Sequence, residues 1–219
     1  MRTGVATGLR EFAARELAAD RAVHLLGIAL GVTGAIAIIV IAAAMRRLDD
    51  LPPVLIYTAG LLAMLGCSAA YNMFRTSRWR DWLRRFDHAA IFAMIAGTYT
   101  PFTLLGLKGT WSIALTTVIW AVAAIGIAIK LLKPDRIETV SIGLYLALGW
   151  IGVVAAGPFM AAFDPVILSL LAAGGILYSS GVVFHLWHHL PYQNAIWHGF
   201  VLAAAAVHYA AVVGVVVEA

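Results

Sequence analysis

Seven apolar runs follow one another along this chain of 219 residues, and they constrain its fold more than any other feature. Each run is about as long as the roughly 20 apolar residues that a helix needs to cross a bilayer. Hydrophobic residues make up 63% and charged residues 12% of the sequence, whereas a soluble domain has about 25% charged residues. The sequence therefore predicts an all-α, polytopic membrane protein, a seven-transmembrane helix bundle that forms a single domain over residues 1–219.

The spans are predicted at about residues 22–45, 54–74, 86–107, 111–132, 139–159, 165–186 and 195–217. Residues 1–20 alternate apolar and charged side chains at helical spacing, which predicts an amphipathic helix at the membrane interface. In the third predicted span we expect Tyr99, Thr100 and Pro101 to shape a kink, with the hydroxyls of Thr98 and Thr100 bonding to the carbonyls that the kink frees. The single cysteine, Cys67, excludes an intramolecular disulfide.

The basic residues are distributed unevenly between the two ends of the predicted helices. Four precede the first span, five lie between the second and third, and three lie around the end of the fourth, against three on the other side. Basic loops stay in the cytoplasm, so the sequence predicts an N-in/C-out orientation. The net charge of +4 then reflects topology and contact with anionic head groups, and a nucleic-acid partner is not expected.

Polar side chains inside the spans gather near the predicted cytoplasmic ends. Three pairs have i,i+4 spacing and so share a helix face, and one aspartate lies at the same depth. These residues are Asp20 with His24, Ser68 with Asn72, Asn194 with His198, and Asp87. One pair alone would indicate hydrogen bonding between helices, but several at one depth predict a polar cluster in a single site. His208 lies deeper, and we expect it to be a packed or bundle-facing polar residue.

Several motifs together resemble the hemolysin III group of the progestin and adipoQ receptor (PAQR) family, and the resemblance runs from Glu16 to about Val213. The motifs are E-x3-D-x3-H from Glu16 to His24, F-D-H-A-A-I-F from Phe86 to Phe92, G-T-Y-T-P-F from Gly97 to Phe102, L-Y-L-A-L-G-W from Leu144 to Trp150, and L-P-Y-Q-N-A-I-W-H-G-F-V from Leu190 to Val201. The resemblance implies a seven-span protein with N-in topology, located in a bacterial inner membrane.

The family also implies a zinc site, built from one histidine in S-x3-H and two in H-x3-H. Here Asn72 and Asn194 stand at two of these positions, and only His198 remains. An amide oxygen is a poor zinc ligand, so the usual zinc chemistry is not expected. The two asparagines favour a hydrogen-bonded network in place of the metal. A substitute ligand set of His198, Asp87 and His24, with His185 in reserve, stays open.

Two functions remain open from the sequence. The favoured one is binding of a membrane lipid or fatty acid in a polar cavity on the cytoplasmic side, serving membrane homeostasis without the usual zinc hydrolase activity. The alternative is a zinc-dependent, ceramidase-like hydrolase of lipid amides or esters, in which Asp87 orients water, Ser68 supports it and His198 binds zinc. A pore-forming hemolysin is less favoured, because the spans are too apolar to line a wide aqueous path. The sequence does not define an oligomeric state.

Overall fold

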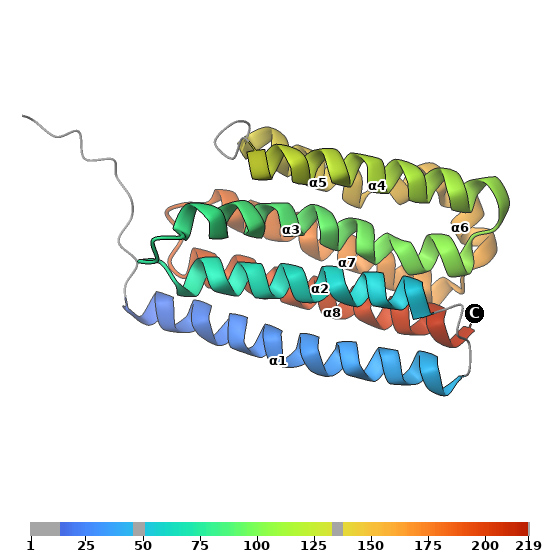
Figure 1. Ribbon diagram of the computed structural model, residues 1–219, viewed down its shortest axis with the longest axis horizontal. Coiled ribbons are helices and arrows are strands. Elements are labelled where there is room, and N and C mark those ends of the chain that lie inside the picture. The colour runs from blue at the N-terminus through green and yellow to red at the C-terminus, as the bar shows by residue number, and fades with distance from the viewer. Residues whose placement is uncertain (1–13, 46–50, 133–137, 219) are drawn as a thin grey trace, which may run out of the picture.

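The computed structural model describes residues 14–45, 51–132 and 138–218, and it is a bundle of long helices lying roughly side by side (Figure 1). The elements in order are α1 (Ala14–Ala44), α2 (Leu51–Met73), α3 (Arg80–Pro101), the π-helical turn η2 (Phe102–Gly106), α4 (Gly109–Leu132), α5 (Glu138–Gly149), the 3-10 turn η3 (Ile151–Ala155), α6 (Ala156–Ala162), α7 (Pro165–Leu186) and α8 (Gln193–Glu218). No strand occurs in these three segments, and the all-α prediction is confirmed.

Within the described residues, seven helical stretches are long and apolar enough to cross a membrane, with η2 continuing α3 in the third span and α5, η3 and α6 together making the fifth. Large apolar side chains remain exposed on the outside of the bundle, as a helix surface facing lipid requires. Examples are Leu25, Ile36, Ile113, Ile125 and Val154. The protein is therefore an integral membrane protein with seven transmembrane helices, as the sequence predicted.

The helices depart from the predicted spans most clearly at three places. Helix α3 begins at Arg80, six residues before the predicted start of the third span. Helix α1 begins at Ala14, so residues 14–21 continue directly into the first span, while the rest of the expected interfacial helix lies outside the described residues. The fifth span is broken into α5, η3 and α6. Pro158 contributes to this break because it has no amide hydrogen to bond to the carbonyl of residue 154.

Where the kink was expected, helix α3 stops at Pro101 and the chain continues as the π-helical turn η2. The hydroxyl of Thr98 donates to the carbonyl of Met94 at 2.8 Å, and that of Thr100 donates to the carbonyl of Ala96, also at 2.8 Å. Each threonine thus bonds to the carbonyl one turn earlier in its own helix; neither acceptor is the carbonyl of Gly97, the one that Pro101 frees.

Helices α2 and α3 approach each other closely through glycines. A Cβ atom on Gly60 would lie 3.0 Å from the carbonyl oxygen of Ala93, and one on Gly97 would lie 3.2 Å from that of Ile56. Small residues allow this kind of backbone approach in membranes. The contact fixes how the end of α2 and the start of α3 lie against each other, where the polar residues of both helices are found.

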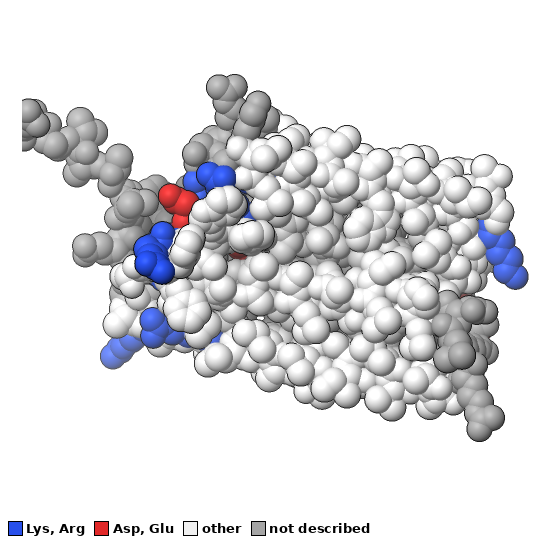
Figure 2. All heavy atoms as spheres, viewed as in Figure 1, with Lys and Arg blue, Asp and Glu red and all other residues white. Residues whose placement is uncertain are grey.

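Basic side chains are concentrated at one end of the described bundle (Figure 2). This end contains the start of α1, the loop from α2 to α3, and the end of α4. At the opposite end the described residues include Lys108, between η2 and α4. The polar residues of the predicted site lie at the basic end.

Candidate functional site

A cavity of about 850 Å³ opens inside the bundle, toward the upper end of the range typical of small-molecule sites. It lies between α1, α2, α3 and α8 on one side and α5, η3, α6 and α7 on the other. Seven residues singled out from the sequence line it: His24, Ser68, Asn72, Asp87, Asn194, His198 and His208. The structure thus brings residues from four helices to one cavity.

Helix α1 contributes one buried face to this region. Glu16, Asp20 and His24 follow each other at four-residue spacing and are 7%, 3% and 7% exposed. The Oε1 atom of Glu16 accepts a hydrogen bond of 2.9 Å from the backbone N–H of Tyr192. Tyr192 has φ 59°, a left-handed conformation that is uncommon for a residue with a side chain. Glu16 therefore anchors the turn that precedes α8, and with it the start of that helix.

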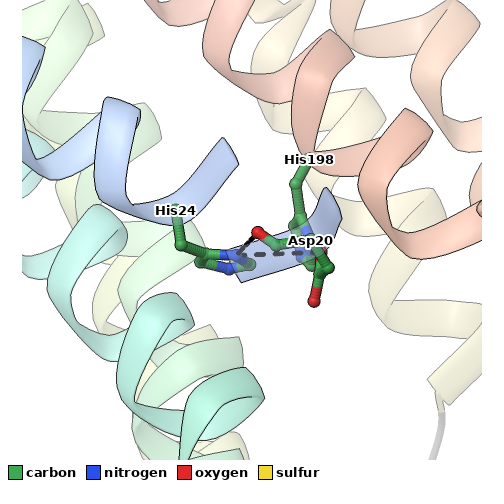
Figure 3. A group of neighbouring side chains, drawn as sticks. All are labelled: Asp20, His24 and His198. Carbon is green, nitrogen blue, oxygen red and sulfur yellow. Dashed lines mark hydrogen bonds and ion pairs between the residues drawn. The ribbon is translucent and has the colours of Figure 1, made fainter. Parts of the chain in front are cut away.

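Asp20 contacts two histidines through different oxygens (Figure 3). The Nδ1 atom of His24 lies 2.8 Å from the backbone oxygen of Asp20, and the Nδ1 atom of His198 lies 2.6 Å from its Oδ1. When each imidazole is neutral, these acceptors favour the tautomer with the proton on Nδ1, which leaves Nε2 with a lone pair. The ring centroids are 4.3 Å apart. Asp20 thus orients both rings.

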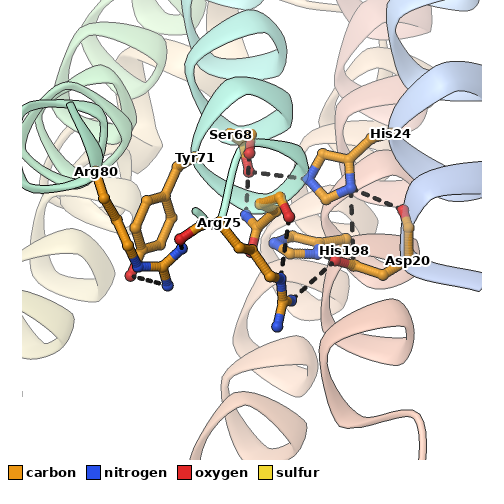
Figure 4. Close-up of polar contacts among 8 residues, drawn as sticks. Asp20, His24, Ser68, Tyr71, Arg75, Arg80 and His198 are labelled. Carbon is orange, nitrogen blue, oxygen red and sulfur yellow. Dashed lines mark hydrogen bonds and ion pairs between the residues drawn. The ribbon is translucent and has the colours of Figure 1, made fainter. Parts of the chain in front are cut away.

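Ser68 connects this group to helix α2 (Figure 4). Its Oγ atom lies 3.3 Å from Nε2 of His24, and it also interacts with the Asp87 carboxyl of α3. A hydroxyl has one proton, so Ser68 can donate to only one of these partners at a time. The polar network therefore joins α1 and α2 through Ser68, with Asp87 of α3 beside it.

The three positions that hold zinc according to the family resemblance do not fit the metal here. Asn72 and Asn194 replace two imidazoles with neutral amides, and His198 is one ligand where a catalytic zinc needs three. The Asn72 amide nitrogen also donates 3.0 Å to the carbonyl of Ser68 in its own helix. The Asn72 amide thus makes a hydrogen bond within α2.

A different group could hold a metal ion. One ligand atom from each of Asp20, His24 and His198 lies within 4.8 Å of the others. The substitute set expected from the sequence had Asp87 as its carboxylate, whereas the carboxylate close to both histidines is Asp20. A cation already lies nearby, because Nη2 of Arg75 is 3.8 Å from Oδ2 of Asp20.

Two roles were not expected from the sequence. Asp20 was assigned to a polar cluster and not to the orientation of His198, because nothing in the sequence shows how α1 and α8 pack together. Arg75 was assigned to topology and to contact with anionic head groups at the membrane surface, yet it lines the cavity. Its position three residues after Asn72, near the same helix face, is the signal that could have revealed this.

The deeper histidine lies apart from this group. The Nε2 atom of His208 is 3.1 Å from the backbone oxygen of Leu171 in α7. Along α8 it is about 15 Å from His198, at 1.5 Å per residue. His185 also lines the cavity, and its ring packs against Trp197 with centroids 5.0 Å apart. Neither histidine belongs to the Asp20 group.

The fold and the cavity define a class: a seven-helix integral membrane protein with a buried polar group at one end of an internal cavity. The sequence profile of the family described as haemolysin-III related matches residues 19–209. The chain is 35% identical to the hemolysin-3 homolog of Bacillus subtilis (strain 168), over 89% of this chain and 92% of the relative. It is 32% identical to hemolysin-3 of Bacillus cereus, over 93% and 92%.

A more distant similarity extends to animals. The chain is 32% identical to the human monocyte to macrophage differentiation factor, over 72% of this chain and 67% of the relative. The chain therefore belongs to the haemolysin-III-related family, within the wider PAQR family.

Proposed function

We propose that this protein binds a membrane lipid or fatty acid in its internal cavity and serves membrane homeostasis without the zinc hydrolase chemistry that the PAQR resemblance implies. The observation that carries the proposal is the cavity of about 850 Å³ with polar residues at one end. In a membrane protein the natural ligand of such a space is an amphiphile, because its head and its chain match the two parts of the lining.

The two parts of the cavity differ in chemistry. Near the basic end the lining includes Ser68, Asn72 and Asp87. Farther into the bundle it includes apolar residues of η3, α6 and α7. Among them are Val153, Phe159, Met160, Leu168 and Ala172. Asn194 and His208 both line the cavity, and they are about 20 Å apart along α8 at 1.5 Å per residue. This length suits an extended acyl chain.

The cytoplasmic leaflet of a bacterial inner membrane is the proposed side of the polar group. The support is the concentration of basic residues at that end of the described bundle. This orientation places the N-terminus in the cytoplasm and the C-terminus outside. A lipid would then enter with its head group near the cytoplasmic surface.

The test is equilibrium binding of radiolabelled palmitate to the purified protein in nanodiscs. Ala172 lines the cavity and Ala173 does not, although both are exposed neighbours in α7. We expect Ala172→Trp to fill the cavity and abolish saturable binding, and Ala173→Trp to bind like the wild type. Equal binding by both variants, or no saturable binding by the wild type, would overturn the proposal.

A second candidate is a zinc-dependent lipid amide or ester hydrolase. The observation that favours it is the proximity of Asp20, His24 and His198, with Asp87 and Ser68 available in the same network. The test is metal analysis of protein purified from zinc-supplemented cells. About one zinc per chain, lost in His198→Ala, would support this candidate, and a metal-free wild type would remove it.

A further inference from the structure

We propose that the ligand has an anionic head group, a carboxylate or a phosphate, which binds among Arg75, Arg80 and Arg84 at the polar end of the cavity. The inference rests on the proposed lipid-binding function and adds that the protein selects its lipid by the charge of the head group. All three arginines line the cavity. Arginine suits this role because its planar guanidinium group matches the geometry of carboxylates and phosphates.

The three arginines come from one short stretch of chain. Arg75 lies in the loop after α2, Arg80 is the first residue of α3, and Arg84 follows it one turn later. Residues at i and i+4 share a helix face, and His88, one further turn along, also lines the cavity. The first turns of α3 therefore present a basic face to the cavity next to Asp87.

Two of these guanidinium groups are held in place by neighbours. Arg80 lies over the ring of Tyr71, 4.7 Å from its centroid, and its Nη1 donates 3.3 Å to the carbonyl of Arg75. The Nε atom of Arg75 donates 3.1 Å to the carbonyl of Asn72. Side chains fixed before binding lose less conformational entropy when a ligand arrives. These contacts therefore favour anion binding.

The charges at this end leave a positive excess. Asp20 lies 3.8 Å from Arg75 and offsets part of its charge. Asp87 is the carboxylate among the residues that line the cavity, whereas Asp81, between Arg80 and Arg84 in sequence, does not line it. Three guanidinium groups thus stand against two carboxylates. An anionic head group complements this excess, whereas a cationic head group would be repelled.

Not every arginine in this stretch faces the cavity. Arg78 lies over the ring of Trp79 at 5.2 Å, and Arg85 donates 2.9 Å to the carbonyl of Leu131 in α4. Neither residue lines the cavity. A topology signal needs only positive charge near the membrane surface. It does not require that three of the five arginines, Arg75, Arg80 and Arg84, line the cavity. Arg78, which is exposed, therefore provides a matched control.

The experiment is displacement of radiolabelled palmitate by four unlabelled amphiphiles of equal chain length: palmitate, hexadecyl phosphate, hexadecanol and hexadecyltrimethylammonium. It uses the full-length protein in phosphatidylcholine nanodiscs at about pH 8, where a carboxylic acid is ionised. We expect both anions to displace the label and hexadecanol to be about tenfold weaker or worse, since hydrogen bonds to charged groups contribute about 1.5–3 kcal/mol. The preferred anion identifies the head group as carboxylate or phosphate.

Variants of the arginines test whether these side chains cause the preference for anionic head groups. We expect Arg84→Gln and Arg80→Gln each to weaken palmitate binding while leaving the weaker hexadecanol binding unchanged, and Arg78→Gln to change neither. Thermal unfolding of each variant separates loss of binding from loss of fold, and Arg84→Lys provides a second variant that keeps the charge.

If hexadecanol binds as tightly as palmitate, or if both Gln variants keep wild-type palmitate affinity, the head-group proposal is overturned while lipid binding stands. If no amphiphile binds saturably, the proposed function is overturned as well.

Discussion

At the scale of single residues, Asp20 connects three other residues of the polar network. Its backbone oxygen is 2.8 Å from His24, its Oδ1 is 2.6 Å from His198, and its Oδ2 is 3.8 Å from Arg75. It is 3% exposed. A buried carboxylate in a membrane span is costly unless it is paired, and these partners supply the pairing.

Replacing Asp20 with alanine should therefore destabilise the protein. The change leaves the His198 Nδ1 atom without its acceptor and removes a carboxylate beside Arg75, at a cost of about 1–3 kcal/mol. Asp20→Asn keeps an acceptor oxygen and should cost less. Thermal unfolding in detergent measures the difference, and an Asp20→Ala variant as stable as the wild type would contradict the described network.

Restoring histidine at positions 72 and 194 should create a zinc site. Asn72→His combined with Asn194→His completes three imidazoles with His198, the set that the family resemblance implies, and three ligands with an open position suit catalytic zinc. We expect about one zinc per chain in the double variant and none in the wild type, measured by elemental analysis. Adding His198→Ala should remove the metal. Zinc already present in the wild type would contradict the proposed function.

At the scale of elements, the contact between α2 and α3 positions the site. It depends on Gly60, where a Cβ atom would lie 3.0 Å from a backbone oxygen, while a Cβ atom on Gly66 in the same helix would meet nothing within 4 Å. Gly60→Ala should therefore force the helices apart and lower the melting temperature. Gly66→Ala should be neutral or slightly stabilising, because alanine favours helix more than glycine does. Equal effects of the two variants would contradict this packing.

The helices could be predicted well from the sequence, and their interruptions less well. Hydropathy locates a span because the bilayer requires a long apolar run, and residues 165–186 were predicted with the bounds that α7 has. The break between α5 and α6 was not predicted, because Gly149 and Pro158 lie in a run that is apolar throughout. The sequence placed residues of α1 and α8 in one polar cluster, but the direct contact between Asp20 and His198 was not predicted, since it depends on how the two helices pack.

At the scale of the whole molecule, the polar side chains of the described network lie at one end of the bundle. The described network from α1, α2, α3 and α8 lies at the basic end of the bundle. This arrangement follows from two facts in the sequence: the polar pairs lie near the ends of their runs, and the runs alternate in direction. The convergence of the polar pairs on one site was expected on these grounds. The extension of the cavity along α8 as far as His208 was not expected.

The orientation of the bundle can be tested with introduced cysteines. In a Cys67→Ser background, Ser77→Cys lies in the basic loop after α2, and Ser112→Cys lies near the start of α4 at the other end. With the N-terminus in the cytoplasm, a membrane-impermeant maleimide added to intact spheroplasts should label position 112 and not position 77. The reverse pattern would show that the bundle has the opposite orientation.

The central claim, that a lipid chain occupies the internal cavity, is tested most directly by photocrosslinking. A palmitate carrying a diazirine at its chain end is bound to the protein in nanodiscs, irradiated, and the crosslinked residues are mapped by mass spectrometry. We expect adducts on cavity residues of α6 and α7 such as Met160 and Ala172, suppressed by excess unlabelled palmitate. Adducts confined to outward residues such as Ile113 and Ile125, unaffected by competition, would contradict the claim.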